Sequence, residues 1–392
     1  MSRRSPARVR RVAEPGAGPS APESVPLAPR RRRSRVVPGD RGLWPRLKRL
    51  ILHASKLTGL QAVVRESRWR QARLLVLCYH GISTDDEHEW NAELYMPAPM
   101  FRRRLEILRD GGYSVLPLDD AVERLYQGTL PPRSVVITFD DGAANFYSRA
   151  LPLLREFDFP ATVYLTTYHT SARRPVFDVT LPYILWKGRH RSLSRDVVGG
   201  EGEWRLSDAA EREQAREALR AHLIARGRGG HAEEALLAEV ARRLGVDFDA
   251  IRERRIMHLM TEEEVSVAAE LGVSIQLHTH RHRTPRDEAE FAREIEVNRG
   301  HIVRLTRRTD GRWHFCYPNG WRARKFIPWL RGLDVRSAAT CQPGIASRTT
   351  DPILLPRLVD TTLLSEIEFE GWLSGVSAFL PRRVQPYGHD DV

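Results

Sequence analysis

The chain has 392 residues, of which 41% are hydrophobic and 29% charged. This composition is typical of a globular protein and excludes a collagenous, fibrous or wholly disordered chain. The formal net charge of +12 at first indicates a nucleic-acid partner. However, residues 1–50 hold 14 of the 62 Lys and Arg residues but only 3 of the 50 Asp and Glu residues. The rest of the chain is therefore nearly neutral, and the basic charge belongs to an N-terminal tail.

Residues 1–40 combine many arginines with Pro, Ala, Gly and Ser. Such a stretch has too few apolar side chains to offset the entropy of ordering it, so we predict a disordered basic N-terminal tail. Prolines follow the early arginines where the apolar part of a signal peptide would lie, and no run of about 18 apolar residues indicates a transmembrane helix. Cys78, Cys316 and Cys341 give no disulfide framework. We therefore expect a cytoplasmic protein.

Residues 41–73 form a predicted amphipathic helical segment, in which leucines and valines recur among Arg46, Lys48 and Arg49. One interpretation is a basic helix on the anionic inner face of a membrane, with residues 1–64 as the contact region. The other interpretation, which we favour, is a helix that docks on the rest of the chain, because most amphipathic helices bury their apolar face on their own protein.

Short apolar strands alternate with helices from residue 74 onward. Strands are predicted at 74–78, 135–139, 161–166, 273–277, 313–317, 337–341 and 353–359, and helices at 100–109, 143–157, 261–271, 287–306, 325–333 and 364–380. The stretch 170–258 breaks the alternation, and we interpret it as a helix-rich insertion with too few apolar residues to be an independent domain. The pattern predicts an α/β fold over residues 74–392, a deformed (β/α) barrel of about seven parallel strands with this insertion.

Polar clusters follow four of the predicted strands. They are Tyr79-His80, Asp140-Asp141-Gly142, the run from His278 to His282, and the run from Tyr317 to Gly320. The carboxyl ends of the strands of a parallel barrel form one mouth, where such barrels place their active sites. We therefore expect the four clusters to converge.

The adjacent carboxylates Asp140 and Asp141 follow an apolar strand directly. Two like charges this close repel, which raises the pKa of one unless a cation lies between them. One carboxylate can then bind a metal while the other accepts a proton. The alternative is a solvated turn or a helix cap, since Asp is favoured at both.

His278 and His282 are candidate metal ligands. Along a straight strand they would stand about 13 Å apart, too far for one ion, so both can be ligands only if the chain curls just after Leu277. A set of His and carboxylate ligands suits zinc or a related divalent ion and leaves a position for water. The alternative is a His-rich surface loop. The spacing of His280 from His278 makes it a neighbour of the site rather than a ligand.

Two of these clusters carry a resemblance to a known family. The segments from Thr138 to Gly142 and from His278 to His282 resemble the first two motifs of the polysaccharide deacetylase (NodB-homology) carbohydrate esterases. The segment 315–320 is similar to a third motif, and 77–81 resembles the strand that opens many members. The resemblance covers about residues 74–360.

The resemblance implies a metal-dependent hydrolase of carbon–nitrogen bonds that removes N-acetyl groups from an amino-sugar polysaccharide, an oligosaccharide or a lipid-linked glycan precursor, as in exopolysaccharide metabolism. It implies that Asp141, His278 and His282 hold the metal and that Asp140 is the catalytic base. Zinc is the expected metal, with cobalt, nickel and manganese as alternatives. Substrate and oxyanion contacts are expected from Tyr317, Pro318 and Asn319.

The chain departs from the family pattern at two positions. Cys316 stands where the third motif commonly has the arginine that orients the base, and the late segment 354–357 lacks the histidine that often acts as general acid. His80 is our candidate for that acid, with a buried structural histidine as the alternative. These departures motivate a second function, a barrel that binds glycan without hydrolysing it. A third, nucleic-acid binding through the arginine tail, has no recognition motif in the body of the chain to support it.

Overall fold

The computed structural model describes residues 43–308 and 310–381. The predicted tail at residues 1–40 and its suggested nucleic-acid partner therefore lie outside the described residues. In the described part of the chain, no helix combines the length and the apolar character needed to cross a membrane.

The centre of the fold is one curled sheet in which every pairing is parallel. Its strand order is β11-β10-β9-β6-β5-β1-β12, with β4 paired to β5 at the side. A parallel bridge between Ala339 and Leu355 links β11 to the segment that leads into β12, so the two ends of the sheet approach each other. The strands are β1 (Leu75–Tyr79), β4 (Ser114–Val115), β5 (Ser134–Asp141), β6 (Thr162–Leu165), β9 (Ser274–Leu277), β10 (Trp313–Cys316), β11 (Val335–Ala339) and β12 (Leu358–Val359). The predicted deformed barrel of about seven parallel strands is confirmed.

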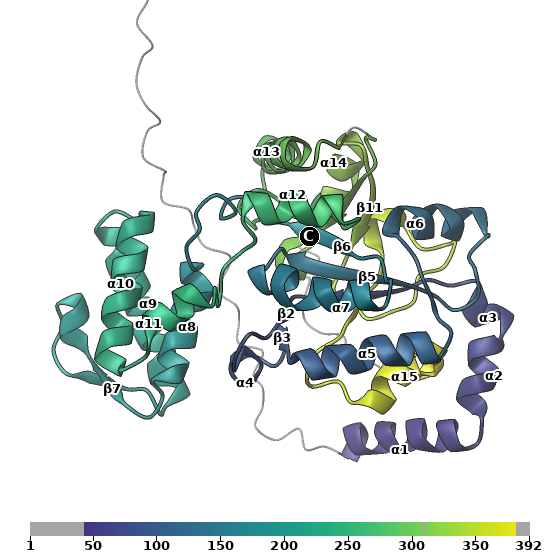
Figure 1. The fold of residues 1–392 in the computed structure, drawn as a ribbon, viewed down its shortest axis with the longest axis horizontal. Helices are drawn as coiled ribbons and strands as arrows, with labels where there is room; N and C mark the ends of the chain where they lie inside the picture. The colour runs from purple at the N-terminus through teal and green to yellow at the C-terminus, as the bar shows by residue number, and fades with distance from the viewer. Residues whose placement is uncertain (1–42, 309, 382–392) are drawn as a thin grey trace, which may run out of the picture. The chain divides into compact units, whose positions relative to one another are not determined.

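Helices cover the outer face of this sheet (Figure 1). Those around the barrel are α4 (Glu87–Trp90), α5 (Ala98–Asp110), α6 (Leu118–Gln127), α7 (Leu151–Glu156), α12 (Glu262–Glu270), α13 (Glu288–Thr306), α14 (Phe326–Gly332) and α15 (Glu366–Ser374). A capping box opens α12, because Thr261 accepts a hydrogen bond from the Glu264 N–H and the Glu264 side chain accepts one from the Thr261 N–H.

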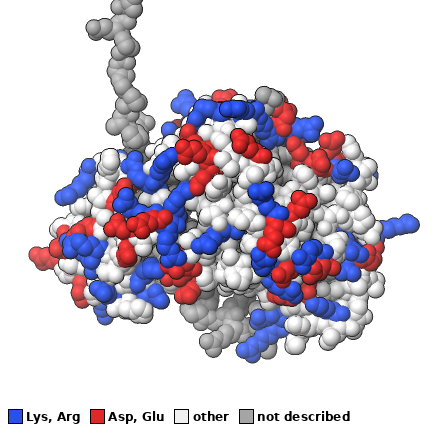
Figure 2. Space-filling model, in the orientation of Figure 1, with Lys and Arg blue, Asp and Glu red and all other residues white. Residues whose placement is uncertain are grey.

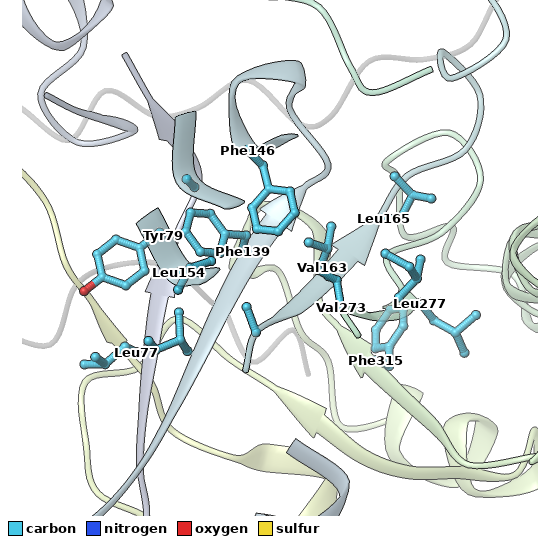
Figure 3. Close-up of a cluster of buried hydrophobic side chains, with 14 of the residues drawn as sticks. Leu77, Tyr79, Phe139, Phe146, Leu154, Val163, Leu165, Val273, Leu277 and Phe315 are labelled. Carbon is cyan, nitrogen blue, oxygen red and sulfur yellow. The ribbon is translucent and has the colours of Figure 1, made fainter. Parts of the chain in front are cut away.

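The strands alternate between an outer and an inner apolar layer. Leu77, Tyr79 and Phe139 belong to the main core with residues of the covering helices, as do the other side chains in Figure 3. The alternate strand residues, such as Val76 and Val136, belong to a second cluster with Cys316 and Leu355. Because successive side chains of a strand point to opposite faces, this register also turns Thr138 and Asp140 to the same side as Val136.

Three elements differ from the sequence prediction. The predicted strand 353–359 pairs as β12 only over Leu358–Val359, because Pro356 has no N–H to donate to a ladder. The predicted closing helix 364–380 ends at Ser374, where Gly375 adopts a φ of 94°. The predicted helix 143–157 begins instead with a π-helical turn over Phe146–Ala150.

The insertion has a hydrophobic cluster of its own. Helices α8 (Phe177–Lys187), α9 (Ala209–Ala225), α10 (Gly230–Leu244) and α11 (Phe248–Glu253) enclose a cluster separate from the barrel core, with the antiparallel strands β7 (Ser192–Ser194) and β8 (Glu203–Arg205). Its members are mostly Leu, Val, Ile and Ala spaced along helices, so a modest apolar content suffices. The insertion leaves the barrel after β6 and returns through a bridge between Leu259 and Ala143, beside the two aspartates.

The segment before the barrel forms three helices, α1 (Leu43–Leu57), α2 (Leu60–Glu66) and α3 (Arg68–Gln71). Leu52 is fully buried in a cluster with Ile367 and Val376, and Lys56 forms an ion pair with Glu370 of α15. The predicted docking of this segment on the rest of the chain is therefore confirmed. A short parallel pair, β2 (Gly81–Ile82) and β3 (Tyr95–Met96), follows β1.

Candidate metal centre and active site

The two aspartates lie at the end of β5, which continues through both of them. Asp140 is buried on the inner side of the sheet, whereas Asp141 is partly exposed and has a φ of 69°. This left-handed conformation turns the chain at the strand end, so that both carboxylates reach the mouth of the barrel. Such conformations are costly for residues other than glycine and gather at functional sites.

The curl expected after Leu277 is present. Thr279 and His282 have φ values of 63° and 55°, and they bring the His278 and His282 rings to 4.9 Å between centroids. The Nε2 atoms of both histidines lie 3.1 Å from Asp141 Oδ1. Two ligands of a tetrahedral zinc ion with bonds of about 2.0–2.1 Å lie about 3.3 Å apart, so these three atoms have the spacing of one ligand set.

Hydrogen bonding at His278 shows that a cation fits between these groups. Its Nδ1 lies 2.9 Å from the carbonyl oxygen of Cys316. A carbonyl oxygen only accepts, so Nδ1 carries a proton and, in the neutral ring, Nε2 presents a lone pair to Asp141. Two lone-pair atoms 3.1 Å apart repel unless a positive charge lies between them. The donor set of Asp141, His278 and His282 therefore fits a divalent metal ion.

The pKa values of Asp141 and His282 are shifted because the two side chains lie close together. Burial alone would raise the pKa of Asp141, but the nearby His282 outweighs it and holds that pKa well below the usual range. Burial alone would lower the pKa of His282, but the Asp141 carboxylate raises it. Each group thus stabilises the charged form of the other.

Asp140 is held by a buried arginine that the sequence analysis did not identify. Arg357 Nη1 donates to Asp140 Oδ1 and Nη2 donates to Oδ2, each at 2.7 Å, and both side chains are almost fully buried. Burial alone would raise the pKa of Asp140, but Arg357 reverses the shift and keeps it well below its usual value. Asp140 is therefore an ionised carboxylate that faces a fixed guanidinium.

Arg357 lies beside the residue that replaces the motif arginine. Its Nη2 is 3.0 Å from Cys316 Sγ, and its Nε donates to the Thr340 carbonyl oxygen at 3.0 Å. The guanidinium from the late segment thus contacts Cys316 on β10, the sequence position at which the third motif commonly has an arginine. An arginine within an otherwise apolar predicted strand was the available signal, because such a residue needs a buried acidic partner.

Two other groups of potential ligands, one with Cys78 and His80 and one with His278 and Cys316, include Asp140. Neither competes well with the set around Asp141. Both oxygens of Asp140 already accept hydrogen bonds from Arg357. Burial raises the pKa of the Cys78 and Cys316 thiols well above the usual value, so they stay protonated and are poor ligands.

His80 lies at the same mouth, after β1. Its Nε2 is 3.9 Å from Asp140 Oδ2, and its side chain is 19% exposed. This position is accessible from the mouth and is unlike the fully buried structural histidine that was the alternative. Its role as the general acid stays a prediction.

The fourth predicted cluster follows β10. The Tyr317 hydroxyl donates to the Ile353 carbonyl oxygen at 3.1 Å, and Tyr317 and Pro318 are buried. Asn319 is exposed with a φ of 56°, so its backbone is turned as at Asp141 and His282. The expected substrate and oxyanion contacts of Tyr317, Pro318 and Asn319 stay predictions.

Two buried polar residues of α13 hold the histidine loop and were also missed. Asn298 Oδ1 accepts from the His278 N–H at 3.0 Å, while its Nδ2 donates to the Leu165 carbonyl oxygen at 2.9 Å. Glu294 accepts from the Arg281 N–H and from Arg283 Nε, each at 2.8 Å. Their helix carries a charged pattern in sequence, and nothing in it distinguishes these buried polar residues from solvated ones.

His280 is a neighbour of the site, as expected. Its Nδ1 lies 2.9 Å from Thr167 Oγ1, and its ring stacks on His301. Burial lowers its pKa to about 4, so the ring is neutral at physiological pH.

The fold is that of a deacetylase barrel. The solved structure of the Streptococcus pyogenes deacetylase PplD in complex with acetate is similar to this chain with a TM-score of 0.51 and 17% sequence identity, over 79% of this chain and 100% of that chain. At this identity the likeness shows the fold alone.

Part of the sequence matches a known family. Residues 127–198, which include Asp140 and Asp141, match the family model described as Polysaccharide deacetylase. The poly-beta-1,6-N-acetyl-D-glucosamine N-deacetylase of Escherichia coli (strain K12) is 28% identical over 102 residues, 26% of this chain and 15% of that protein. The protein of the same name from Staphylococcus epidermidis is 33% identical over 72 residues, 18% of this chain and 25% of that protein. The resemblance to the polysaccharide deacetylase family is confirmed, although the chain spans a third or less of the length of the curated relatives it matches.

Proposed function

We propose that the protein is a metal-dependent hydrolase that removes N-acetyl groups from a glycan of N-acetylated amino sugars, such as a poly-N-acetylglucosamine exopolysaccharide or its lipid-linked precursor. The observation that carries the proposal is one mouth that holds both a ligand set, Asp141 with His278 and His282, and a separate ionised carboxylate, Asp140. The substrate class is supported by two relatives that are named for poly-beta-1,6-N-acetyl-D-glucosamine.

The three ligands would hold a divalent ion, with zinc first and cobalt, nickel or manganese as alternatives. Such an ion supplies a Lewis acid for the amide carbonyl and lowers the pKa of water. The protein contributes the orientation of the ligands, because the bond from His278 Nδ1 to the Cys316 carbonyl oxygen fixes the ring and its tautomer.

Asp140 would act as the general base. Arg357 keeps it ionised and fixes the carboxylate plane through two parallel hydrogen bonds, so a proton acceptor is held ready beside the ligand set. Arg357 does not need to touch the substrate, and we regard it as a positioning residue.

His80 would protonate the leaving amine. The late segment provides Arg357 in place of a histidine, whereas His80 approaches Asp140 within 3.9 Å and is partly open to solvent. Asn319 would donate its backbone N–H to the oxyanion, and its turned, exposed backbone suits this task.

The test is acetate release from an oligosaccharide of β-1,6-linked N-acetylglucosamine by the full chain loaded with zinc or cobalt, with a chitooligosaccharide for comparison. Asp141→Asn and His278→Ala should each abolish release and the bound metal measured by mass spectrometry. His231→Ala, an exposed histidine of α10, is the matched control and should retain both. Full release by the ligand variants would refute the mechanism.

The same experiment addresses the second function, a barrel that binds glycan without hydrolysing it. The absence of a late histidine motivates that alternative, whereas the missing motif arginine no longer does, because Arg357 binds Asp140 from beside Cys316. Metal binding and sugar binding without any acetate release would favour it.

A further inference from the structure

Helix α1 has two apolar faces, and only one of them docks on the protein. The docked face holds Leu52 and Ser55, which are buried, and it is flanked by ion pairs from Lys48 to Glu368 and from Lys56 to Glu370. These contacts leave the opposite side of the helix to solvent.

That opposite side is rich in large apolar residues. On α1, Leu47, Leu50 and Leu57 are 46%, 64% and 88% exposed, and on α2, Leu60 and Val63 are 49% and 68% exposed. The spacing of 47, 50 and 57 places the three leucines on one side of the helix, about opposite to Leu52. We call these three leucines the exposed face. A run of exposed apolar side chains this dense marks a surface that binds something.

The charges around the exposed face are of one sign. From residue 43 to residue 65 the chain has five basic residues and no acidic residue. Lys48 and Lys56 are paired with α15, whereas Arg46 and Arg49 are exposed and have no acidic partner in the described part of the chain. Figure 2 shows Lys and Arg side chains at the lower edge of the view, where α1 lies in Figure 1.

We propose that the exposed face binds the surface of an anionic phospholipid bilayer. Leucines flanked by unpaired arginines are the composition of an interfacial helix, whose apolar side chains enter the boundary of the acyl chains while its cations meet the lipid phosphates. In the sequence, an arginine run at residues 30–35 precedes this helix.

Charge complementarity favours lipid over a second copy of the chain. A symmetric contact between two copies would place the same surface against itself. Arg46 and Arg49 of one copy would then lie near those of the other, with no carboxylate on this stretch of either chain to neutralise them. An anionic bilayer supplies the missing negative charge.

Flotation of the full chain with vesicles tests the proposal. The vesicles are of phosphatidylcholine alone or with about one third phosphatidylglycerol, in about 0.15 M salt. The double variant Leu50→Glu/Leu57→Glu should bind the anionic vesicles at least about tenfold more weakly than the wild type, because it loses two inserted side chains and adds two repelled charges. The matched control Ile224→Glu/Leu271→Glu changes residues that are 42% and 41% exposed elsewhere and should bind like the wild type.

Each variant still carries residues 1–42, so the arginine-rich tail contributes equally and cancels in the comparison. Equal binding by the wild type and the Leu50→Glu/Leu57→Glu variant would overturn the proposal, as would no binding by the wild type. A wild-type dimer in light scattering that the double variant converts to a monomer, with no vesicle binding, would overturn it in favour of a second copy. Circular dichroism melting and acetate release from a soluble oligosaccharide should be unchanged in both double variants, so this result is separate from that of the proposed function.

Discussion

Replacing Arg357 by methionine removes the positive charge that faces Asp140 at the centre of the barrel. Arg357 makes two bonds to Asp140 at 2.7 Å and one each to the Thr340 carbonyl oxygen and Thr138 Oγ1. Methionine matches the length of the arginine stem but satisfies none of these groups. The variant therefore leaves a buried carboxylate without a partner.

The cost follows from the burial of the pair. Breaking a buried ion pair by removing one partner destabilises a protein by about 3–5 kcal/mol, mostly through the charge that is left behind. If that charge is the cause, removing it should restore stability. We expect Arg357→Met to lower the free energy of unfolding by about 3–5 kcal/mol and Arg357→Met/Asp140→Asn to regain at least about half of this loss.

Urea unfolding at neutral pH, followed by circular dichroism, measures these differences. Arg331→Met is the matched control, because its ion pair with Asp351 is exposed and should contribute at most about 1 kcal/mol. Arg357→Lys keeps the charge but not the two parallel bonds, so an intermediate loss is expected. If Arg357→Met were as stable as the wild type, or if the double variant were less stable than Arg357→Met, the assigned role of this pair would be wrong.

Three further predictions concern the loop, the metal and the pH. Asn298→Ala should weaken zinc affinity by about 10–100-fold, measured by competition with a chelating dye, because it frees the His278 backbone; unchanged affinity would contradict this. Adding zinc at about 100 times its dissociation constant to chelator-treated protein should stabilise it by about 2.7 kcal/mol in thermal melts, whereas Asp141→Asn should show no such gain. Burial lowers the pKa of His258 from 6.5 to about 4, so the unfolded chain binds a proton first as the pH falls below about 6.5. Between pH 7 and about 4.5 the wild type should therefore lose about 2 kcal/mol more stability in urea than His258→Gln, and an equal loss would refute this.

The sequence predicted those parts of the site that lie on regular strand ends. Asp140 and Asp141 follow an apolar strand, and the need for a curl after Leu277 followed from strand geometry alone. The structure supplies that curl through left-handed residues at Thr279 and His282. Threonine and histidine do not mark such conformations in a sequence as glycine would, so the position of the curl was not predictable.

The hydrophobic cluster of the insertion was not predicted, for a different reason. Its composition is charged, yet buried residues such as Leu219, Leu223, Leu237 and Val240 recur along α9 and α10 at helical spacing. What decides whether helices form a core is the arrangement of apolar residues on one face, and average apolar content does not report it.

Arg357 provides a positive charge beside Asp140 from the late segment, whereas the third motif commonly has its arginine at the position of Cys316. The segment that ends in β12 passes close to β10, so that the Arg357 guanidinium contacts Cys316 Sγ at 3.0 Å. An arginine at 316 and an arginine at 357 can therefore present a positive charge to the same carboxylate, and only one of them fits beside it. The small, neutral thiol of Cys316 leaves room for the guanidinium of Arg357, which comes from the segment before β12. The two departures from the family pattern thus meet at one carboxylate: the late segment carries an arginine that binds Asp140, and His80 lies 3.9 Å from the same residue.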